Sequence, residues 1–358
     1  MEDNTLFSPF HINTLEVPNR IVRSATVDNL GTVGMVSDAQ LDLYGKLGRG
    51  GIGLIITGGL FPTLDGWAAR GQLGAHTDEV VPSLRKLVDE VHAGDALIAA
   101  QILHGGFQCS GELSGLQPVG PSPMVNEGTG QQVRELSSDE IYAMVESYIQ
   151  AARRIKEAGF DAVQLHGAHG WLLSAFFSPV TNRRTDEWGG TPEKRSRFVR
   201  RILEGIRREA GPDYPVFIKY GMKDYHPEGK TVEEGIETAK LLVAAGADAI
   251  ELSEGIESGW GHHIRPDAVH PYYLEECRQA RQQLTVPIVL VGGMRDVNDM
   301  QSVLDEGIAD AVSLCRPFIR TPNLVNDIRT GSCTGSGCNS CNGCLKEMQN
   351  GTIRCILP

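Results

Sequence analysis

Short runs of apolar residues recur along the chain, and each run ends in glycine or polar residues. Continuous Val, Ile and Leu runs of this length are typical of strands buried on both faces of a parallel sheet. The eight runs, and therefore the eight expected strands, are residues 19–26, 52–59, 96–104, 161–167, 216–221, 248–255, 287–293 and 309–316.

The segments between these runs have helical features. Residues 137–158 carry apolar side chains at helical spacing and open with a predicted capping box, Ser137 with Glu140. Another helix is expected to begin after Thr191, with Pro192 as its first residue. A third is expected after Thr231, with a second capping box that involves Glu234. The remaining helices are predicted at residues 36–48, 78–94, 271–283, 296–307 and 321–330.

Eight strands that alternate with eight helices predict an α/β fold, a (β/α)8 TIM barrel formed by a single domain over residues 1–330. A doubly wound sheet is the alternative. Residues 331–358 are expected to form a short cysteine-rich tail. The stretch "GRGGIG" at 48–53 precedes a strand instead of following one, so it is interpreted as a turn and not as a phosphate-binding loop. Residues 105–136 are predicted to be a loop over the site.

Composition narrows the class of protein. The chain has 358 residues, 41% of them hydrophobic, and a formal net charge of -12. This acidic balance argues against nucleic acid as a partner. The first residues lack the features of a signal peptide, and no apolar run has membrane-spanning length. We therefore expect a cytoplasmic protein without a membrane partner.

The C-terminal ends of the strands should form the active site of such a barrel. Gly292 and Gly293 follow the seventh strand and Arg316 follows the eighth, a combination that suits a phosphate group. Gln101 offers a donor and an acceptor to the imide edge of a flavin. Lys219 could stabilise negative charge on a reduced cofactor, although a single lysine at a strand end can also reach water.

The stretch "HGAH" places His166 and His169 three residues apart at the end of the fourth strand. Two histidines could bind zinc, but no third ligand stands at an obvious spacing. They could instead donate hydrogen bonds to a carbonyl oxygen that gains charge during a reaction. Two ordinary loop histidines in contact with water are the third interpretation.

Four of the eight cysteines crowd into the last 21 residues, with the spacing Cys338-x2-Cys341-x2-Cys344-x10-Cys355. In a reducing compartment this clustering favours metal ligation or redox chemistry over disulfides. A C-x2-C-x2-C run can provide three of the four thiolates of an iron–sulfur cluster. Zinc on four cysteines is also chemically allowed.

Several blocks resemble the old yellow enzyme family of FMN-dependent oxidoreductases, among them "VPNRIVRSAT", "AAQILHGG", "DAVSLCRPFIRTPNL" and the long stretch at 159–198. The resemblance implies an FMN-binding barrel that takes a hydride from NADH or NADPH and passes it to the β-carbon of an α,β-unsaturated carbonyl compound. By the same resemblance His166 and His169 would hydrogen-bond the substrate carbonyl. The implied FMN contacts are Ala25, Thr26, Gly58 and Gln101 at the ring, Lys219 near N1, and Gly292, Gly293 and Arg316 at the phosphate, with Cys315 in place of a glycine there.

The sequence departs from the family at the proton donor. The family usually has a tyrosine two residues after the second histidine, and here that residue is Trp171, whose indole N–H is not a usable general acid. His263, or failing it His262, is the alternative donor, by resemblance to members that carry iron–sulfur clusters.

The cysteine tail resembles that of multidomain relatives such as trimethylamine dehydrogenase and 2,4-dienoyl-CoA reductase, which implies a [4Fe–4S] cluster that exchanges electrons with FMN. Three hypotheses follow. The first is an NAD(P)H-driven ene-reductase with a small-molecule substrate. The second is a cluster-linked enzyme that needs an electron-transfer protein. The third is a flavin- or metal-binding protein with little catalysis. The resemblance also implies a homo-oligomer.

Overall fold

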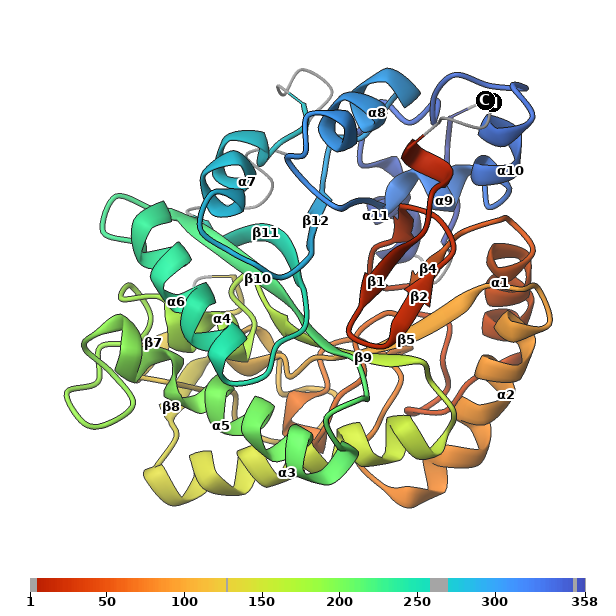
Figure 1. Cartoon of the computed structure of the whole chain (residues 1–358). Coiled ribbons are helices and arrows are strands. Elements are labelled where there is room, and N and C mark those ends of the chain that lie inside the picture. The colour runs from red at the N-terminus through yellow and green to blue at the C-terminus, as the bar shows by residue number, and fades with distance from the viewer. Residues whose placement is uncertain (1–4, 127, 258–269, 350–352, 358) are drawn as a thin grey trace.

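Eight parallel strands close into a barrel at the centre of the molecule (Figure 1). The computed structural model describes residues 5–126, 128–257, 270–349 and 353–357. Each predicted strand is present, which confirms the (β/α)8 barrel and excludes the doubly wound sheet. The barrel strands are β3 (Ile21–Arg23), β4 (Leu54–Ile56), β5 (Leu97–Ile102), β9 (Ala162–Gly167), β10 (Val216–Tyr225), β11 (Ile250–Glu257), β12 (Ile288–Val291) and β13 (Ala311–Leu314).

Helices surround the barrel where the periodicity predicted them. The expected ones are α1 (Asp38–Gly48), α2 (Val81–His92), α3 (Ser138–Glu157), α5 (Pro192–Ala210), α6 (Val232–Ala244), α7 (Leu274–Arg281), α8 (Val297–Asp305) and α10 (Leu324–Arg329). Three short helices were not predicted: α4 (Leu172–Phe177), α9 (Arg316–Arg320) and α11 (Gly343–Gln349). Within the described ranges, the search for a helix both long and apolar enough to span a bilayer found none.

The predicted helix starts are largely confirmed. Ser137 and Glu140 form a complete capping box at α3, and Thr191 caps α5 directly before its first proline. The second capping box is only half present. The Thr231 hydroxyl accepts from the Glu234 N–H, but the Glu234 carboxylate lies 3.4 Å from the Arg195 guanidinium. A buried arginine attracts this carboxylate more strongly than a backbone N–H does.

The inside of the barrel is a packed core. Small residues in three strands and directly before a fourth leave room for apolar side chains of an N-terminal hairpin: Ala99, Ala162, Ala311 and Ala249. This hairpin, β1 (Phe10–Ile12) with β2 (Leu15–Val17), covers the N-terminal end of the barrel strands, and its apolar side chains belong to the same buried cluster. The hairpin closes this end of the barrel, and the pocket described below lies at the opposite end.

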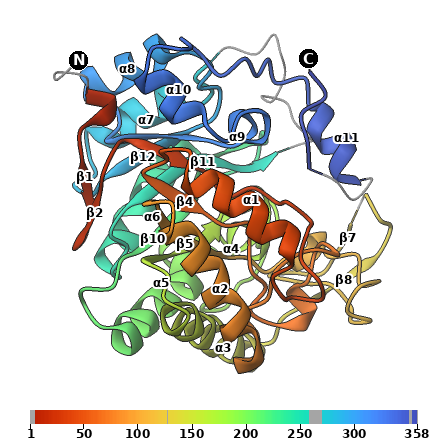
Figure 2. The same cartoon turned by 90° about the vertical axis from the view of Figure 1, so that its right-hand side faces the viewer.

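The sequence predicted a loop at residues 105–136, but part of this segment forms strands. It holds the short strands β6 (Val119–Gly120), β7 (Met124–Val125) and β8 (Gln132–Glu135), which form a separate three-stranded sheet. Figure 2 shows β7, β8 and α11 at one end of the molecule and the β1–β2 hairpin at the other. The stretch 48–53 is the predicted turn between α1 and β4, and Gly51 adopts a positive φ of 81° there.

Candidate active site

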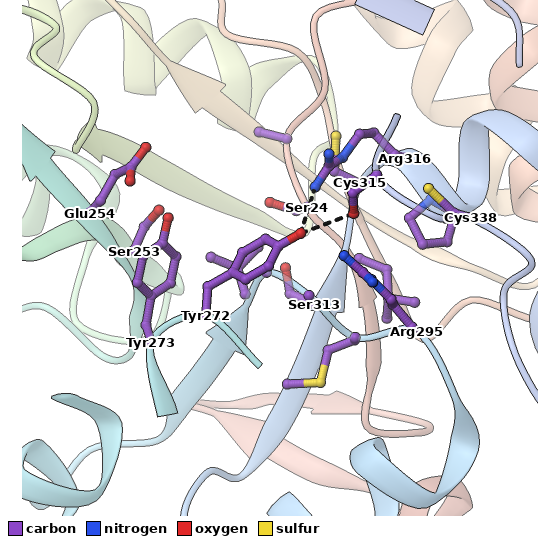
Figure 3. Close-up of a pocket in the computed structure, with 18 of the residues that line it drawn as sticks. Ser24, Ser253, Glu254, Tyr272, Tyr273, Arg295, Ser313, Cys315, Arg316 and Cys338 are labelled. Carbon is purple, nitrogen blue, oxygen red and sulfur yellow. Dashed lines mark hydrogen bonds between the residues drawn. The ribbon is translucent and has the colours of Figure 1, made fainter. Parts of the chain in front are cut away.

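A pocket opens at the C-terminal ends of the barrel strands (Figure 3). It gathers side chains and backbone from β3, β10, β11, β12 and β13 and from the tail. The sequence-predicted residues in its wall are Ala25, His169, Lys219, Gly292, Gly293, Cys315, Arg316 and Cys338. Residues from opposite ends of the sequence therefore meet at the place that the barrel topology predicts.

One part of the pocket is suited to an anion. Gly292 and Gly293 have positive φ values of 100° and 75°, which glycine adopts without strain. A Cβ at either position would lie 2.8–3.0 Å from ring atoms of Tyr272, so glycine is also required for space. Arg316 begins α9 and donates to the Asn342 side chain at 2.9 Å. Its second nitrogen lies 3.5 Å from the Tyr272 hydroxyl.

Three further residues of this region were not identified from the sequence: Tyr272, Arg295 and Ser340. Figure 3 shows the Tyr272 ring reaching across the pocket toward Arg316. Burial would raise the pKa of Tyr272, but hydrogen bonds with Ser340 and Arg295 and the charge of Arg316 lower it. A phenol with a lowered pKa between two arginines indicates a positive potential that would attract a phosphate. The position of Arg295 two residues after Gly293 was the available sequence signal.

Lys219 is not a lysine that reaches water. Its side chain is buried, and its ammonium lies 3.0 Å from the Glu251 carboxylate and 2.8 Å from the Ser24 hydroxyl. Burial alone would raise the pKa of Glu251. The charge of Lys219 and hydrogen bonds with Ser313, Ser24 and Gln164 outweigh this effect and lower it. The Glu251 carboxylate is therefore ionised and faces the Lys219 side chain, which lines the pocket.

Gln101 is buried at the end of β5 and belongs to the same network. Its amide nitrogen donates to the Gln164 carbonyl at 2.7 Å, and the Gln164 amide nitrogen donates to Glu251 at 2.8 Å. Thr26 is also buried, and its hydroxyl contacts the Cys315 sulfur at 3.1 Å. Gly58 follows β4, and its N–H donates to the Tyr44 hydroxyl at 3.1 Å. These residues border the pocket region without lining the pocket itself.

His166 and His169 lie together, with ring centroids 5.0 Å apart. Burial, His169 and Lys219 together hold the pKa of His166 well below its ordinary value. Burial and Lys219 lower the pKa of His169 to about 3. Both rings are therefore neutral near pH 7. His166 is a buried residue of β9, so for it the interpretation as a loop histidine in water is wrong, whereas His169 follows the strand and is half-buried in the pocket wall.

Hydrogen bonds fix both imidazoles. The His166 Nδ1 accepts from the Ala168 N–H at 3.3 Å, so the proton of the neutral ring resides on Nε2. The His169 Nε2 lies 2.7 Å from the Ser253 hydroxyl. His169 also has a positive φ of 59°, which is uncommon outside glycine and clusters at functional sites. Within the described residues no group of three metal-ligating side chains includes this pair.

Trp171 lies next to this pair and starts α4, with its ring centroid 6.4 Å from that of His166. His263 and His262 lie outside the described residues.

The cysteine tail contacts the pocket but does not gather into a metal-binding group. Cys338 lines the pocket, and Cys344 is close enough to Cys315 and Cys338 for their charges to raise its pKa, after burial as the larger cause. The Cys355 sulfur accepts from Arg320 at 3.6 Å. All eight cysteines are described and are free thiols, but no three ligating side chains in the described ranges converge on one point. The donor chemistry of Cys338, Cys341, Cys344 and Cys355 suits a cluster or zinc, whereas their arrangement here does not.

Comparison with known proteins identifies the family. Residues 5–334 match the model of the NADH:flavin oxidoreductase / NADH oxidase family. The chain is 30% identical over 385 residues to 4,4'-dithiodibutanoate disulfide reductase of Rhodococcus erythropolis, with 99% of this chain and 95% of that protein covered. It therefore belongs to the NADH:flavin oxidoreductase / NADH oxidase family, which confirms the resemblance seen in the sequence.

Two of the other similar proteins are longer than this chain, and a third has a similar length. The chain is 35% identical over 365 residues to NADH oxidase of Thermoanaerobacter brockii, and the match covers 98% of this chain but 55% of that protein. A 2-naphthoyl-CoA reductase structure superimposes with a TM-score of 0.91 at 30% identity, over 96% of this chain and 55% of that one. An old yellow enzyme homologue from Zymomonas mobilis gives a TM-score of 0.81 at 26% identity, over 92% of this chain and 94% of that one. This chain thus spans about half the length of the first two proteins.

Proposed function

We propose that this chain is an FMN-dependent oxidoreductase that uses NADH or NADPH to reduce the C=C bond of an α,β-unsaturated carbonyl compound. The observation that carries the proposal is the neutral His166–His169 pair beside Lys219, at the same end of the barrel as an anion site. Family membership and the similarity to a 2-naphthoyl-CoA reductase, in complex with 2-naphthoyl-CoA, a conjugated carbonyl compound, support it.

The residues present fit FMN. The glycine turn and Arg316 would hold the phosphate, since a Cβ would fill this space and the arginine offers several N–H donors. Ala25, Thr26, Gly58 and Gln101 would contact the isoalloxazine ring, and Lys219 would lie near N1. Cys315 would lie beside the phosphate. We assign residues 1–330 to this FMN-binding barrel and residues 331–358 to the tail.

FMN held by Gly292, Gly293 and Arg316 would supply hydride transfer between NAD(P)H and the β-carbon of the substrate. The protein's own contribution is to orient the substrate and polarise its carbonyl. His166 and His169 would donate to the carbonyl oxygen, and neutral imidazoles keep their N–H donors without adding charge to a buried site. Lys219 would stabilise negative charge that develops on the cofactor side.

Steady-state turnover tests the proposal. NAD(P)H consumption should depend on an added enone, and the product should lack the C=C bond. A saturated ketone of the same size should give no turnover. If the FMN-loaded protein oxidises NAD(P)H but leaves every tested enone intact, the proposed substrate class is wrong.

Replacement of Trp171 by tyrosine should raise enone reduction at least about 10-fold, because a positioned general acid contributes about 10²–10⁴-fold. The reason is that the indole cannot protonate the α-carbon and a phenol can. The measurement is the rate at which reduced, FMN-loaded protein consumes the enone, with Trp171→Phe as the control that brings no proton. An equal rate in Trp171→Tyr and Trp171→Phe would assign the proton to another group, such as His263.

A second candidate is a cluster-linked FMN dehydrogenase or reductase that exchanges electrons with a partner protein. The free thiols of Cys338, Cys341, Cys344 and Cys355, and the place of Cys338 in the pocket wall, favour it. Iron, sulfide and zinc in protein purified without oxygen distinguish the cases. About four irons per chain would support a cubane cluster, and zinc would support a structural clip. Bound flavin without metal or enone turnover would support a binding protein with little catalysis.

A further inference from the structure

Glu251 is a buried carboxylate at the centre of the site, and the proposed function gives it no task. It lies on β11 with 0% of its surface exposed. Hydroxyls after β3 and on β13 donate to it, Ser24 at 2.7 Å and Ser313 at 2.5 Å. An amide on β9, that of Gln164, donates at 2.8 Å, and the Lys219 ammonium on β10 lies 3.0 Å away. One side chain thus joins five barrel strands.

An ionised carboxylate can only accept hydrogen bonds, and this property fixes the orientation of the side chains around it. Gln164 must direct its amide nitrogen at Glu251, which leaves its carbonyl oxygen toward Gln101. Gln101 must then direct its own nitrogen at Gln164. The carbonyl oxygen of Gln101 therefore faces away from Gln164 and can accept a hydrogen bond from another partner.

We propose that Glu251 is a positioning residue that sets the hydrogen-bonding polarity of Gln101 and the charge balance of Lys219 at the flavin site. The inference rests on the proposed FMN site and deepens it. An acceptor at Gln101 matches the imide N–H of a flavin, whereas a reversed amide would place two N–H donors against it. The carboxylate also offsets the charge of Lys219, so the cofactor meets an ion pair and not an isolated cation.

Glu251→Gln tests this inference in the FMN-loaded protein. The isosteric amide can donate as well as accept, so Gln164 and Gln101 lose their fixed direction. We expect FMN to dissociate about 10-fold more readily, as for the loss of one charged hydrogen bond. We also expect the midpoint potential of bound FMN to become more positive, because Lys219 is no longer offset. In a Lys219→Met background the buried Glu251 carboxyl loses the cation that lowers its pKa and should be protonated, so the shift in potential caused by Glu251→Gln should disappear.

Two further variants separate positioning from general stability. Ser313→Ala removes a single hydrogen bond to Glu251 and should move the potential in the same direction by a smaller amount, even if Glu251→Gln folds poorly. Asp248→Asn is the matched control. Asp248 pairs with Arg207 and accepts from the Val216 N–H at the other end of the same two strands. Asp248→Asn should lower the stability of the fold and leave the midpoint potential of bound FMN unchanged.

The outcomes are distinguishable. If the unmodified protein binds no FMN, the proposed function and this inference both fail. If it binds FMN and Glu251→Gln changes neither the dissociation constant nor the potential, the inference alone fails. A shift of equal size in Asp248→Asn would also overturn it.

Discussion

Replacement of His166 and His169 together by alanine should lower the rate constant of enone reduction by about 10³-fold, because loss of a single donor of this kind costs about 10²–10³-fold. Both rings are held neutral, at a fixed distance from one another and against Ser253 and the Ala168 N–H. Donors fixed in advance do not have to reorient when charge develops on the carbonyl oxygen. The rate constant is measured by mixing the enone with protein whose FMN has been reduced chemically, so that the step with NAD(P)H does not contribute.

The control for this prediction is His11→Ala. His11 is an exposed histidine on the β1–β2 hairpin, at the opposite end of the barrel, and its loss should leave the rate unchanged. The dissociation constant of FMN should remain similar in the double variant, since neither histidine is assigned to the phosphate or the ring edge. A double variant that reduces the enone as fast as the unmodified protein would remove the histidines from the mechanism.

Arg316→Met should weaken FMN binding by about 100-fold, because each hydrogen bond to a charged group contributes about 1.5–3 kcal/mol. The arginine opens α9 beside the glycine turn, and its guanidinium already lies among hydroxyl and amide partners in the pocket. Riboflavin lacks the phosphate, so its dissociation constant should be nearly the same in both proteins. Fluorescence titration of the apoprotein with each flavin measures the difference.

Arg320→Met is the matched control for Arg316→Met. Arg320 ends the same short helix and donates to the Cys355 sulfur, and it is not part of the pocket wall. FMN affinity should therefore be retained. If Arg316→Met weakens riboflavin and FMN equally, the arginine supports the pocket as a whole and does not hold the phosphate.

The barrel itself could be predicted because buried parallel strands appear as uninterrupted apolar runs. The short helices α4, α9 and α11 were not predicted, since five to seven residues give too few turns for a helical period to be visible. The equally short α10 was predicted from its place in the alternation of strands and helices. The strands of the 105–136 segment are equally short and lie among glycine, proline and serine residues.

The site was predictable where one residue at a strand end carries the chemistry, as for Lys219, Arg316 and the two histidines. The network around Glu251 was not, because it depends on strand register. Lys219 lies opposite Glu251 on β11 and opposite His166 on β9, and Gln101 lies opposite Gln164. Residues that are tens of positions apart become neighbours only when the pairing is known. Tyr272 and Ser340 were missed for the same reason, since their contact joins the segment before α7 to the tail.

A single anaerobic turnover tests the central claim most directly. FMN-loaded protein is first reduced with one equivalent of NADH or NADPH, and one equivalent of an enone is then added in the absence of oxygen. The account predicts that the oxidised flavin absorbance returns completely and that one equivalent of saturated product forms. Flavin that stays reduced after addition of the enone, in protein that NAD(P)H reduces readily, would contradict it.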